Sequence, residues 1–237
     1  MNPSYFYNQY KFYKDKRAWL NQGGEITIDY PIIDEHALQA GDIDFHYFNQ
    51  DLLVANDIYK RNPKRHIDIG SRIDGFVSHL AVFREVEVFD VRPMHMTLHK
   101  NIIFTQINIS KIRGIQKADS ISCLHAIEHF GLGRYGDSID VDGHLKGLKN
   151  IISMMNNKGI LYLSFPIGKA DEVYFNAHRV FNPKSILQYD FVMDNLKLVN
   201  FDYVDDDGKL YRSFDIFEKT PNVNKYGCGI YTFQRKT

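Results

Sequence analysis

The chain has 237 residues, of which 44% are hydrophobic and 24% are charged, and its 29 basic residues balance its 29 acidic residues. This length suits one large domain or two small ones, and the lack of a basic excess gives no indication of a nucleic-acid partner. Two isolated cysteines do not form a disulfide framework, and no stretch reaches the ~18 apolar residues of a membrane-spanning helix, so we expect a cytoplasmic protein without a membrane partner.

The first 60 residues contain helical segments, and we expect them to pack in front of the rest of the chain and cover its site. From about residue 66 onward, short apolar runs alternate with amphipathic stretches, which is the pattern of βαβ units. Because no Pro/Gly/Ser-rich linker interrupts the chain, we predict one domain over residues 1–237, with an N-terminal segment at 1–60 and a Rossmann-like core at 61–237.

Seven apolar runs predict strands, and two stretches between them predict helices. The predicted strands cover residues 66–70, 85–91, 101–109, 120–125, 159–166, 197–204 and 227–235. The predicted helices cover residues 75–83 and 145–155. Strands and helices that alternate in this way form an open doubly wound sheet, which binds its ligands at the carboxyl ends of the parallel strands.

The loop after the first strand contains the pattern Asp68-x-Gly70 and leads into a helix. A phosphate-binding P-loop would need lysine after Gly75, where Phe76 stands, and a dinucleotide-binding loop would need glycine in place of Arg72. What remains is an acidic residue close to a glycine that lets the backbone approach a ligand. This pattern is compatible with an ordinary tight turn as well as with a cofactor-binding loop.

Polar residues also follow the second and third strands. Asp90 ends the second strand, 22 residues after Asp68, and an acidic residue at about this interval typically accepts hydrogen bonds from ribose hydroxyls. Asn108 lies at the end of the third strand, where a polar side chain can lie near an adenine ring. The sequence therefore favours a nucleoside-containing cofactor at this edge of the sheet.

Several strings in a fixed order carry a resemblance to a known family. They are HYFNQD (residues 46–51), HIDIGSRIDGF (66–76), LHAIEHFGLGRYGD (124–137), SFPIG (164–168) and HRVFNP (178–183). Together they resemble a bacterial family known as domain of unknown function number 268, whose members look like class I S-adenosylmethionine-dependent methyltransferases. The resemblance spans roughly residues 40–235.

This resemblance implies an α/β fold with a doubly wound, Rossmann-like, seven-stranded sheet, mostly parallel with an antiparallel last strand. It implies S-adenosyl-L-methionine as the cofactor and a link to surface or capsule polysaccharide biosynthesis. The residues expected to hold the cofactor are Asp68, Gly70, Ser71, Arg72, Asp90, Val91, Asn108 and His125.

A cluster of titratable residues follows the fourth strand and suggests the chemistry. His125, Glu128 and His129 are expected at the edge where a transferred methyl group would emerge, and His129 is our candidate general base for an acceptor hydroxyl. Tyr135 lies on the following loop, and Arg179 can bind an anionic group of the acceptor in a bidentate fork. We therefore expect O-methylation of a small polar acceptor, a sugar or a phosphorylated precursor, by an enzyme to which we assign no metal ligands and that can form a homodimer.

Three other functions compete with this hypothesis. The HAIEH string matches the H-x-x-E-H motif of zinc hydrolases, in which His125 and His129 would be ligands and Glu128 the base. A nucleotide-sugar oxidoreductase or epimerase would need a Tyr-x-x-x-Lys pair late in the domain, but Tyr10 and Lys14 form that pair at the wrong end of the chain. A non-catalytic binding module would keep the fold and lose its affinity for the cofactor.

Overall fold

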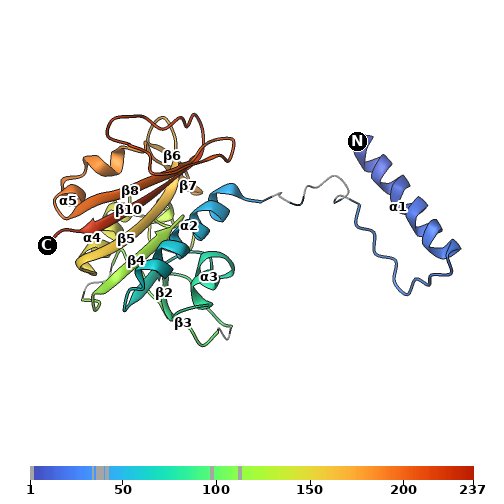
Figure 1. Cartoon of the computed structure of the whole chain (residues 1–237), viewed down its shortest axis with the longest axis horizontal. Coiled ribbons are helices and arrows are strands. Elements are labelled where there is room, and N and C mark those ends of the chain that lie inside the picture. Colours follow the sequence, from blue (N-terminus) through green and yellow to red (C-terminus); the bar gives the residue numbers. More distant parts are fainter. Residues whose placement is uncertain (1–2, 34, 36–39, 41–42, 97–98, 112–113) are drawn as a thin grey trace. The chain divides into compact units, whose positions relative to one another are not determined.

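The protein divides into two compact units, Met1–Ile43 and Asp44–Thr237 (Figure 1). The computed structural model describes residues 3–33, 35, 40, 43–96, 99–111 and 114–237. The first unit contains helix α1 (Pro3–Asn21), against which the next residues fold back: Trp19 Nε1 donates a hydrogen bond to the Glu25 carbonyl at 3.1 Å. Helix α2 (Phe45–Arg61) belongs to the second unit, so the helical segment expected over residues 1–60 is divided between the two units.

The second unit is built on one mixed sheet. Among the described residues its strands follow the order β3-β2-β1-β4-β5-β10-β8-β9. Their bounds are β1 His66–Ile69, β2 Val86–Asp90, β3 Ile102–Gln106, β4 Ala118–Leu124, β5 Met155–Ile167, β8 Leu196–Val204, β9 Leu210–Tyr211 and β10 Gly227–Arg235. Strands β1 to β5 pair in parallel, and β10 runs antiparallel between β5 and β8. The doubly wound α/β fold with an antiparallel last strand is therefore confirmed.

The predicted number of seven strands is wrong, because the described part of the sheet contains eight. The additional strand is the two-residue β9, which pairs with β8 across a tight turn. Asp205 makes this turn: its side chain accepts hydrogen bonds from the backbone N–H groups of Asp207 at 3.0 Å and Lys209 at 2.9 Å. The aspartate-rich turn thus joins β8 to β9 before the chain continues to β10.

Three further differences concern short elements. Instead of a helix at 75–83, a π-helical turn at Ile73–Val77 precedes the four-residue helix α3 (Ser78–Ala81), because the backbone at Gly75 is not helical. A small separate hairpin of β6 (Glu172–Tyr174) and β7 (His178–Val180) follows β5. Helix α4 covers Gly143–Ser153 and helix α5 covers Asp190–Met193, with single 3₁₀ turns at Ile127–His129 and Ser185–Gln188.

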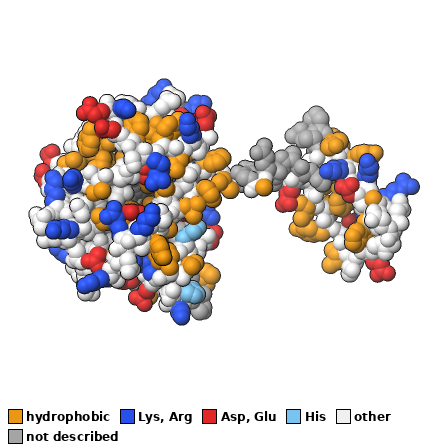
Figure 2. Space-filling view, in the orientation of Figure 1, with side chains coloured by type: hydrophobic (Ala, Val, Ile, Leu, Met, Phe, Trp, Pro, Cys, Tyr) orange, Lys and Arg blue, Asp and Glu red, His pale blue; other side chains and the backbone are white. Residues whose placement is uncertain are grey.

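Two hydrophobic clusters lie on opposite faces of the sheet. Val54 and Ile58 of α2 and Leu80 of α3 belong to one cluster, whereas Ile151 of α4 and Val192 of α5 belong to the other (Figure 1). Charged side chains of both signs are interspersed over the surface of the second unit (Figure 2). No helix in the described ranges combines the length and the apolar composition needed to cross a membrane.

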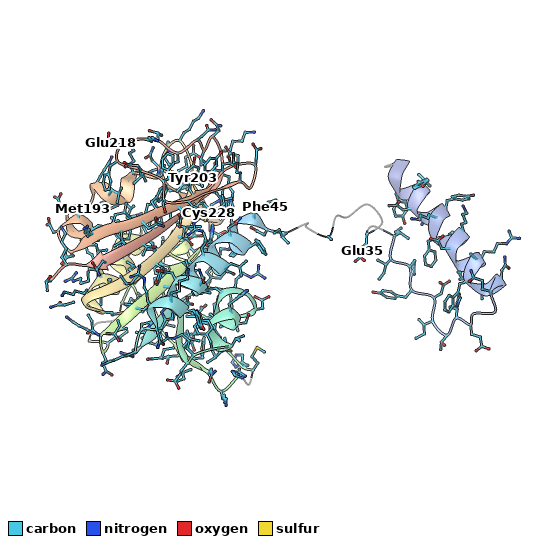
Figure 3. The ribbon with its side chains drawn as sticks, viewed as in Figure 1. Glu35, Phe45, Met193, Tyr203, Glu218 and Cys228 are labelled. Atoms are coloured by element: carbon cyan, nitrogen blue, oxygen red, sulfur yellow. The ribbon has the colours of Figure 1, made fainter. Side chains whose placement is uncertain are left out.

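This topology places the beginning of β10 at the functional edge of the sheet. Because β10 is antiparallel to β5, its first residues pair with the last residues of β5, and Cys228 lies opposite Pro166. Cys228 belongs to the hydrophobic cluster on the α2 side of the sheet, close to the end of α2 that begins with Phe45 (Figure 3). Residues from α2, β4 and β10 therefore meet at the carboxyl ends of the parallel strands.

Candidate active site

A pocket of about 580 Å³, open to solvent, lies at the carboxyl ends of β1, β2 and β4. Among the residues expected at the site, those that line the pocket are Gly70, Asp90, Val91, Asn108, His125, His129 and Tyr135. Those that do not line it are Asp68, Ser71, Arg72, Glu128 and Arg179.

Gly70 makes the sharp turn at the end of β1. Its φ of +71° lies in the left-handed region, which favours glycine, and its N–H donates to the Phe89 carbonyl at 2.9 Å. A Cβ atom at this position would come within 3.0 Å of the Ala126 Cβ. The chain therefore needs glycine here, both for the turn and for the close approach of the loop that follows β4.

Asp68 and Ser71 hold this turn from behind the pocket wall. The Asp68 carboxylate accepts hydrogen bonds from the hydroxyls of Ser71 and Ser122, both at 2.6 Å, and from the Ser71 N–H at 3.1 Å. Burial raises the pKa of Asp68 to about 6, although these hydrogen bonds oppose that shift. Asp68 is fully buried and hydrogen-bonded within the protein, so its role is to shape the loop.

Asp90 faces the pocket at the end of β2, where an arginine holds it. The Arg92 side chain donates through Nε to Asp90 Oδ1 at 2.9 Å and through Nη2 to Oδ2 at 2.5 Å. The Arg92 backbone N–H also donates to Oδ1 at 2.8 Å. The carboxylate is therefore fixed in orientation and lies within reach of a ligand in the pocket.

The opposite wall comes from the segment after β3. Ile107 and Ile109 line the pocket on either side of Asn108, whose Oδ1 accepts a hydrogen bond from the Ser110 N–H at 3.0 Å. Val91 completes this part of the wall. Aliphatic side chains around one amide form a surface suited to a flat heteroaromatic ring.

Arg72 lies outside the pocket on the exposed surface. Its guanidinium pairs with Asp74 at 3.1 Å and stacks over the Tyr47 ring at 5.1 Å from the ring centre. It therefore joins the loop after β1 to the start of α2.

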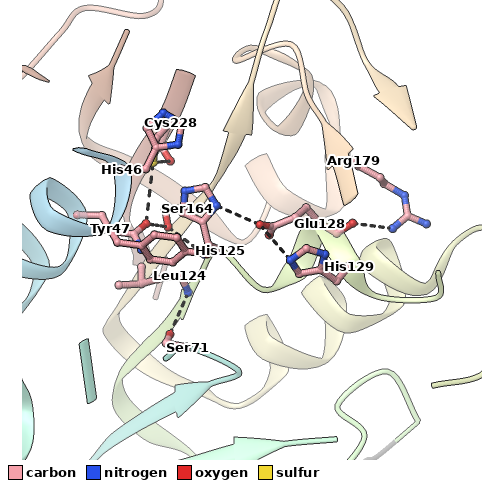
Figure 4. A network of polar contacts seen from close by, with 12 residues as sticks. His46, Tyr47, Ser71, Leu124, His125, Glu128, His129, Ser164, Arg179 and Cys228 are labelled. Atoms are coloured by element: carbon pink, nitrogen blue, oxygen red, sulfur yellow. Dashed lines mark hydrogen bonds and ion pairs between the residues drawn. The ribbon is translucent and has the colours of Figure 1, made fainter. Parts of the chain in front are cut away.

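The buried His125 and Glu128 form a polar network with the half-buried His129 (Figure 4). His125 Nδ1 lies 3.1 Å from Glu128 Oε1, and His129 Nε2 lies 3.6 Å from the same oxygen. Burial by itself disfavours a charged His125, but the nearby Cys228 sulfur and the Glu128 carboxylate more than offset it and raise the pKa of His125. Glu128 thus serves both imidazoles without lining the pocket itself.

His129 has the properties of a neutral base. Its Nδ1 donates to the Ala177 carbonyl at 2.7 Å, which leaves the lone pair on Nε2, and the ring lines the pocket. Burial lowers the pKa of His129, and the carboxylate of Glu128 opposes this shift only in part. The imidazole is therefore neutral at pH 7, with a carboxylate close enough to stabilise the proton it would take up.

Arg179 has a different role from the anion binding that we expected. Its buried guanidinium donates to the carbonyls of Phe130 at 2.7 Å, Glu128 at 3.2 Å and Val141 at 3.4 Å. These bonds tie the β6–β7 hairpin to the loop after β4. The side chain is occupied by backbone acceptors, so the structure gives no support for a contact with the acceptor.

Aromatic and imidazole rings form a rim beside the pocket. Tyr135 packs edge-on against His129 with ring centres 5.4 Å apart, and His129 lies 6.4 Å from His178. Tyr226 lies 5.4 Å from His178 and 5.3 Å from His46. This continuous set of rings offers flat apolar faces with polar edges.

The structure gives no support for the two rival enzyme functions. The zinc-hydrolase motif needs both histidines on one helix. His125 is not in a helix: it follows β4 with a φ of +47°, and only a three-residue 3₁₀ turn comes after it. Tyr10 and Lys14, the pair that an epimerase would use, lie on α1 in the first unit, whereas all residues lining the pocket belong to the second.

The sequence did not indicate two residues that the fold brings to this site, Arg92 and Cys228. Arg92 follows Asp90 by two residues, and only its observed bidentate contact distinguishes it from other surface arginines. Cys228 was treated as an isolated cysteine. The expected antiparallel last strand could have indicated Cys228, because the first residues of such a strand must lie at the carboxyl ends of the parallel strands.

Comparison with protein-family models identifies one match. Residues 98–193 match "Caenorhabditis protein of unknown function, DUF268". The match covers a smaller part of the chain than the resemblance over residues 40–235, and the family description does not bear on the bacterial origin that we expected. None of the curated proteins matches the sequence.

Solved structures resemble the fold over most of its length. The N-methyltransferase NodS from Bradyrhizobium japonicum, in complex with S-adenosyl-L-homocysteine, has a TM-score of 0.56 at 13% identity, covering 83% of this chain and 90% of NodS. An S-adenosylmethionine-dependent methyltransferase from Clostridium acetobutylicum has a TM-score of 0.52 at 12% identity, with coverages of 86% and 96%. The [4+2]-cyclase SpnF has a TM-score of 0.54 at 10% identity, with coverages of 96% and 95%.

Similarity at 10–13% identity shows the fold, and the cyclase demonstrates that this fold also carries reactions other than methyl transfer. The chain therefore has the Rossmann-like fold of the class I S-adenosylmethionine-dependent methyltransferases.

Proposed function

We propose that this protein is a methyltransferase that binds S-adenosylmethionine in the pocket at the ends of β1, β2 and β4 and methylates a small-molecule acceptor. The observation that carries this proposal is the joint presence of Gly70 and Asp90 on the wall of one pocket, at the functional edge of this fold. Structural relatives such as NodS, which was solved with S-adenosyl-L-homocysteine, support the same assignment.

The residues that line the pocket fit the cofactor. Gly70 lines the pocket without a side chain, so its backbone can approach a ligand closely, and we assign the amino-acid part of the cofactor to this position. Asp90 offers two carboxyl oxygens for the ribose hydroxyls, with Arg92 holding them in place. We place the adenine between Val91, Ile107 and Ile109, with Asn108 at its polar edge. When bound, the cofactor supplies an electrophilic methyl group on a sulfonium ion.

We assign the general base to His129. Its Nε2 carries a free lone pair on the pocket wall, and the proton it takes from an acceptor hydroxyl would lie 3.6 Å from Glu128 Oε1. A carboxylate at that distance favours the imidazolium as it forms. The arrangement thus suits an acceptor oxygen that must lose a proton as it is methylated.

We propose a neutral sugar hydroxyl as the acceptor, in the context of surface polysaccharide biosynthesis that the sequence resemblance suggests. The rings of Tyr135, His178 and Tyr226 give flat apolar faces and hydrogen-bonding edges, a combination that suits a pyranose ring. A phosphorylated acceptor fits less well, because Arg179 is bound to backbone carbonyls and Arg92 is bound to Asp90.

The experiment that tests cofactor binding is a calorimetric titration with S-adenosyl-L-homocysteine of two matched variants. Asp90 and Asp74 each pair with an arginine two residues away, but only Asp90 lines the pocket. Asp90→Ala should weaken binding by about 1.5–3 kcal/mol, the scale of hydrogen bonds to a charged group. Asp74→Ala should leave the affinity unchanged. Wild-type protein that shows no binding, or equal affinity in both variants, would contradict the proposal.

A further inference from the structure

A second cluster of chemically reactive side chains adjoins the pocket. His46 comes from the first turn of α2, His125 from the end of β4 and Cys228 from the start of β10 (Figure 4). One donor atom from each of these residues lies within 4.8 Å of the other two. Three segments that are far apart in the sequence thus converge on one point.

The protein leaves the metal-binding atoms of this cluster poorly satisfied. The Nε2 atom of His125 is buried and makes no hydrogen bond of ordinary geometry among the described residues, although the Cys228 sulfur lies close enough to raise the pKa of His125. The Cys228 sulfur is also fully buried, and it lies 3.9 Å from Gln50 Oε1 and 3.8 Å from the Gly229 carbonyl. A buried polar atom without a partner is rare in native proteins, and a ligand bound to it is one explanation.

The other nitrogen of His125 is fixed in the way that metal sites require. A hydrogen on Nδ1 can be donated to Glu128 Oε1, 3.1 Å away, and a metal ion on Nε2 would take the place of the second ring proton. Metal-binding histidines commonly donate their second ring N–H to a carboxylate in this manner. Glu128, which does not line the pocket, would thus orient a ligand.

The donor set indicates which metal would bind. One thiolate and two imidazoles suit zinc, whereas magnesium and calcium prefer oxygen ligands. Zinc–sulfur bonds of about 2.3 Å and zinc–nitrogen bonds of about 2.0 Å put tetrahedral donors roughly 3.3–3.6 Å apart. The observed separations, all within 4.8 Å, are at most about 1.5 Å longer than in this geometry.

We propose that His46, His125 and Cys228 bind a single zinc ion, and that Glu128 orients His125 for this purpose. Three protein ligands leave the fourth tetrahedral position open to water or a small molecule, as in catalytic zinc sites. Because His125 also lines the pocket, this position adjoins the space that we assign to the cofactor and acceptor. The ligands differ from the H-x-x-E-H set, since His46 and Cys228 replace His129.

Cobalt(II) provides a direct spectroscopic test on the full-length protein. Protein stripped of metal with a chelator and titrated with cobalt(II) should bind one ion and develop the charge-transfer band of a cobalt–thiolate bond. Zinc(II) added afterwards should displace cobalt and abolish the band. Cys228→Ser should lose this band, whereas Cys123→Ser should keep it, because Cys123 is the other buried cysteine and lies outside the cluster.

Two further variants keep the test decisive if Cys228→Ser does not fold. His46→Ala removes a half-buried ligand from the first turn of α2 and should weaken zinc binding strongly. Glu128→Gln should weaken it about 10–100-fold, as expected for a residue that orients a metal ligand. Wild-type protein without a thiolate band, or a band lost only in Cys123→Ser, would overturn the proposal. Calorimetry with S-adenosyl-L-homocysteine on metal-free protein tests the methyltransferase assignment separately.

Discussion

At the scale of single residues, His129 is the side chain on which the proposed chemistry depends most. Replacing it by alanine should lower kcat about 10²–10⁴-fold, because the acceptor hydroxyl would lose its general base. The affinity for S-adenosyl-L-homocysteine should change little, since the cofactor contacts assigned to Gly70 and Asp90 remain. Steady-state kinetics together with calorimetry would measure both quantities.

The pH profile gives this prediction an independent readout. Since burial lowers the pKa of His129, the wild-type kcat should stay level from neutral pH to below about 6.5 and fall in more acidic solution. In His129→Ala the decline due to this group should be absent. His178→Ala is the comparison variant. The His178 ring lies 6.4 Å from the His129 ring on the same rim, and its removal should leave the acidic decline of kcat in place. Turnover of His129→Ala within a few-fold of wild type would assign the base elsewhere.

His144 predicts a dependence of stability on pH. Burial, assisted by the nearby Arg179, lowers the pKa of His144 to about 4, and its buried Nδ1 has no hydrogen-bond partner among the described residues. Since the unfolded chain binds this proton near pH 6.5, the contribution of His144 to stability is present above that pH and is lost as the pH falls toward 4. The ring adjoins an apolar cavity lined by Leu148, Phe165 and Phe181.

His144→Phe should therefore raise the free energy of unfolding and reduce its decline between pH 7 and pH 4.5. Urea denaturation at several pH values would measure both effects. A variant with the same acid dependence as the wild type would show that other groups, such as the buried His66, control acid unfolding.

Single residues also show where sequence reasoning succeeds. Gly70 and Asp90 could be placed because they end apolar strands, and strand ends in this fold define the site. The binding partners of the Arg72 and Arg179 side chains could not be inferred from the sequence. A long side chain beside the site can bind a ligand, a carboxylate or a backbone carbonyl. Only the tertiary structure shows that Arg72 pairs with Asp74 and that Arg179 serves the loop after β4.

At the scale of secondary structure, the start of α2 is held by one capping residue. The Asp44 side chain accepts hydrogen bonds from the N–H groups of His46 at 3.0 Å and Tyr47 at 3.3 Å. Asp44→Ala should lower the free energy of unfolding by about 1 kcal/mol, while Asp44→Asn should retain most of the capping. Thermal denaturation would compare the two. If both variants lost the same free energy of unfolding, the effect would come from the charge of Asp44 and not from its hydrogen bonds.

The buried strands were predictable, but the short exposed ones were not. Strands β1, β4 and β5 are largely buried on both faces, so continuous apolar runs indicate them. All three residues of β6 are exposed, and β9 has only two residues, so neither produces an apolar pattern. The prediction of a helix at 75–83 was wrong because the backbone at Gly75 is not helical. A Cβ atom at this position would lie 2.9 Å from Asp51 Oδ2.

At the scale of the whole molecule, the second unit should be an independent folding unit. Both hydrophobic clusters and all the residues that line the pocket lie between residues 44 and 237. A chain that begins at Asp44 should therefore unfold cooperatively and bind S-adenosyl-L-homocysteine as the full chain does. Circular dichroism and calorimetry would establish this.

A chain that begins at Asn62 is the informative control, because it lacks α2 and the buried residues Val54 and Ile58. It should not fold. If the chain from Asp44 folds but binds S-adenosyl-L-homocysteine less tightly, residues 1–43 would contribute to the site. That result would support the prediction that the N-terminal segment covers it.

The position of β10 has a consequence for how the protein is made. β10 is synthesised after every other strand of this sheet, yet it lies between β5 and β8 and pairs with both. A nascent chain that lacks it exposes two apolar strand edges, which are prone to intermolecular pairing. A premature stop would remove an interior strand of the sheet, together with Cys228, rather than a strand at its margin. The ribosome must therefore release β10 before the sheet can close, and cellular quality control can recognise incomplete chains by their open edges.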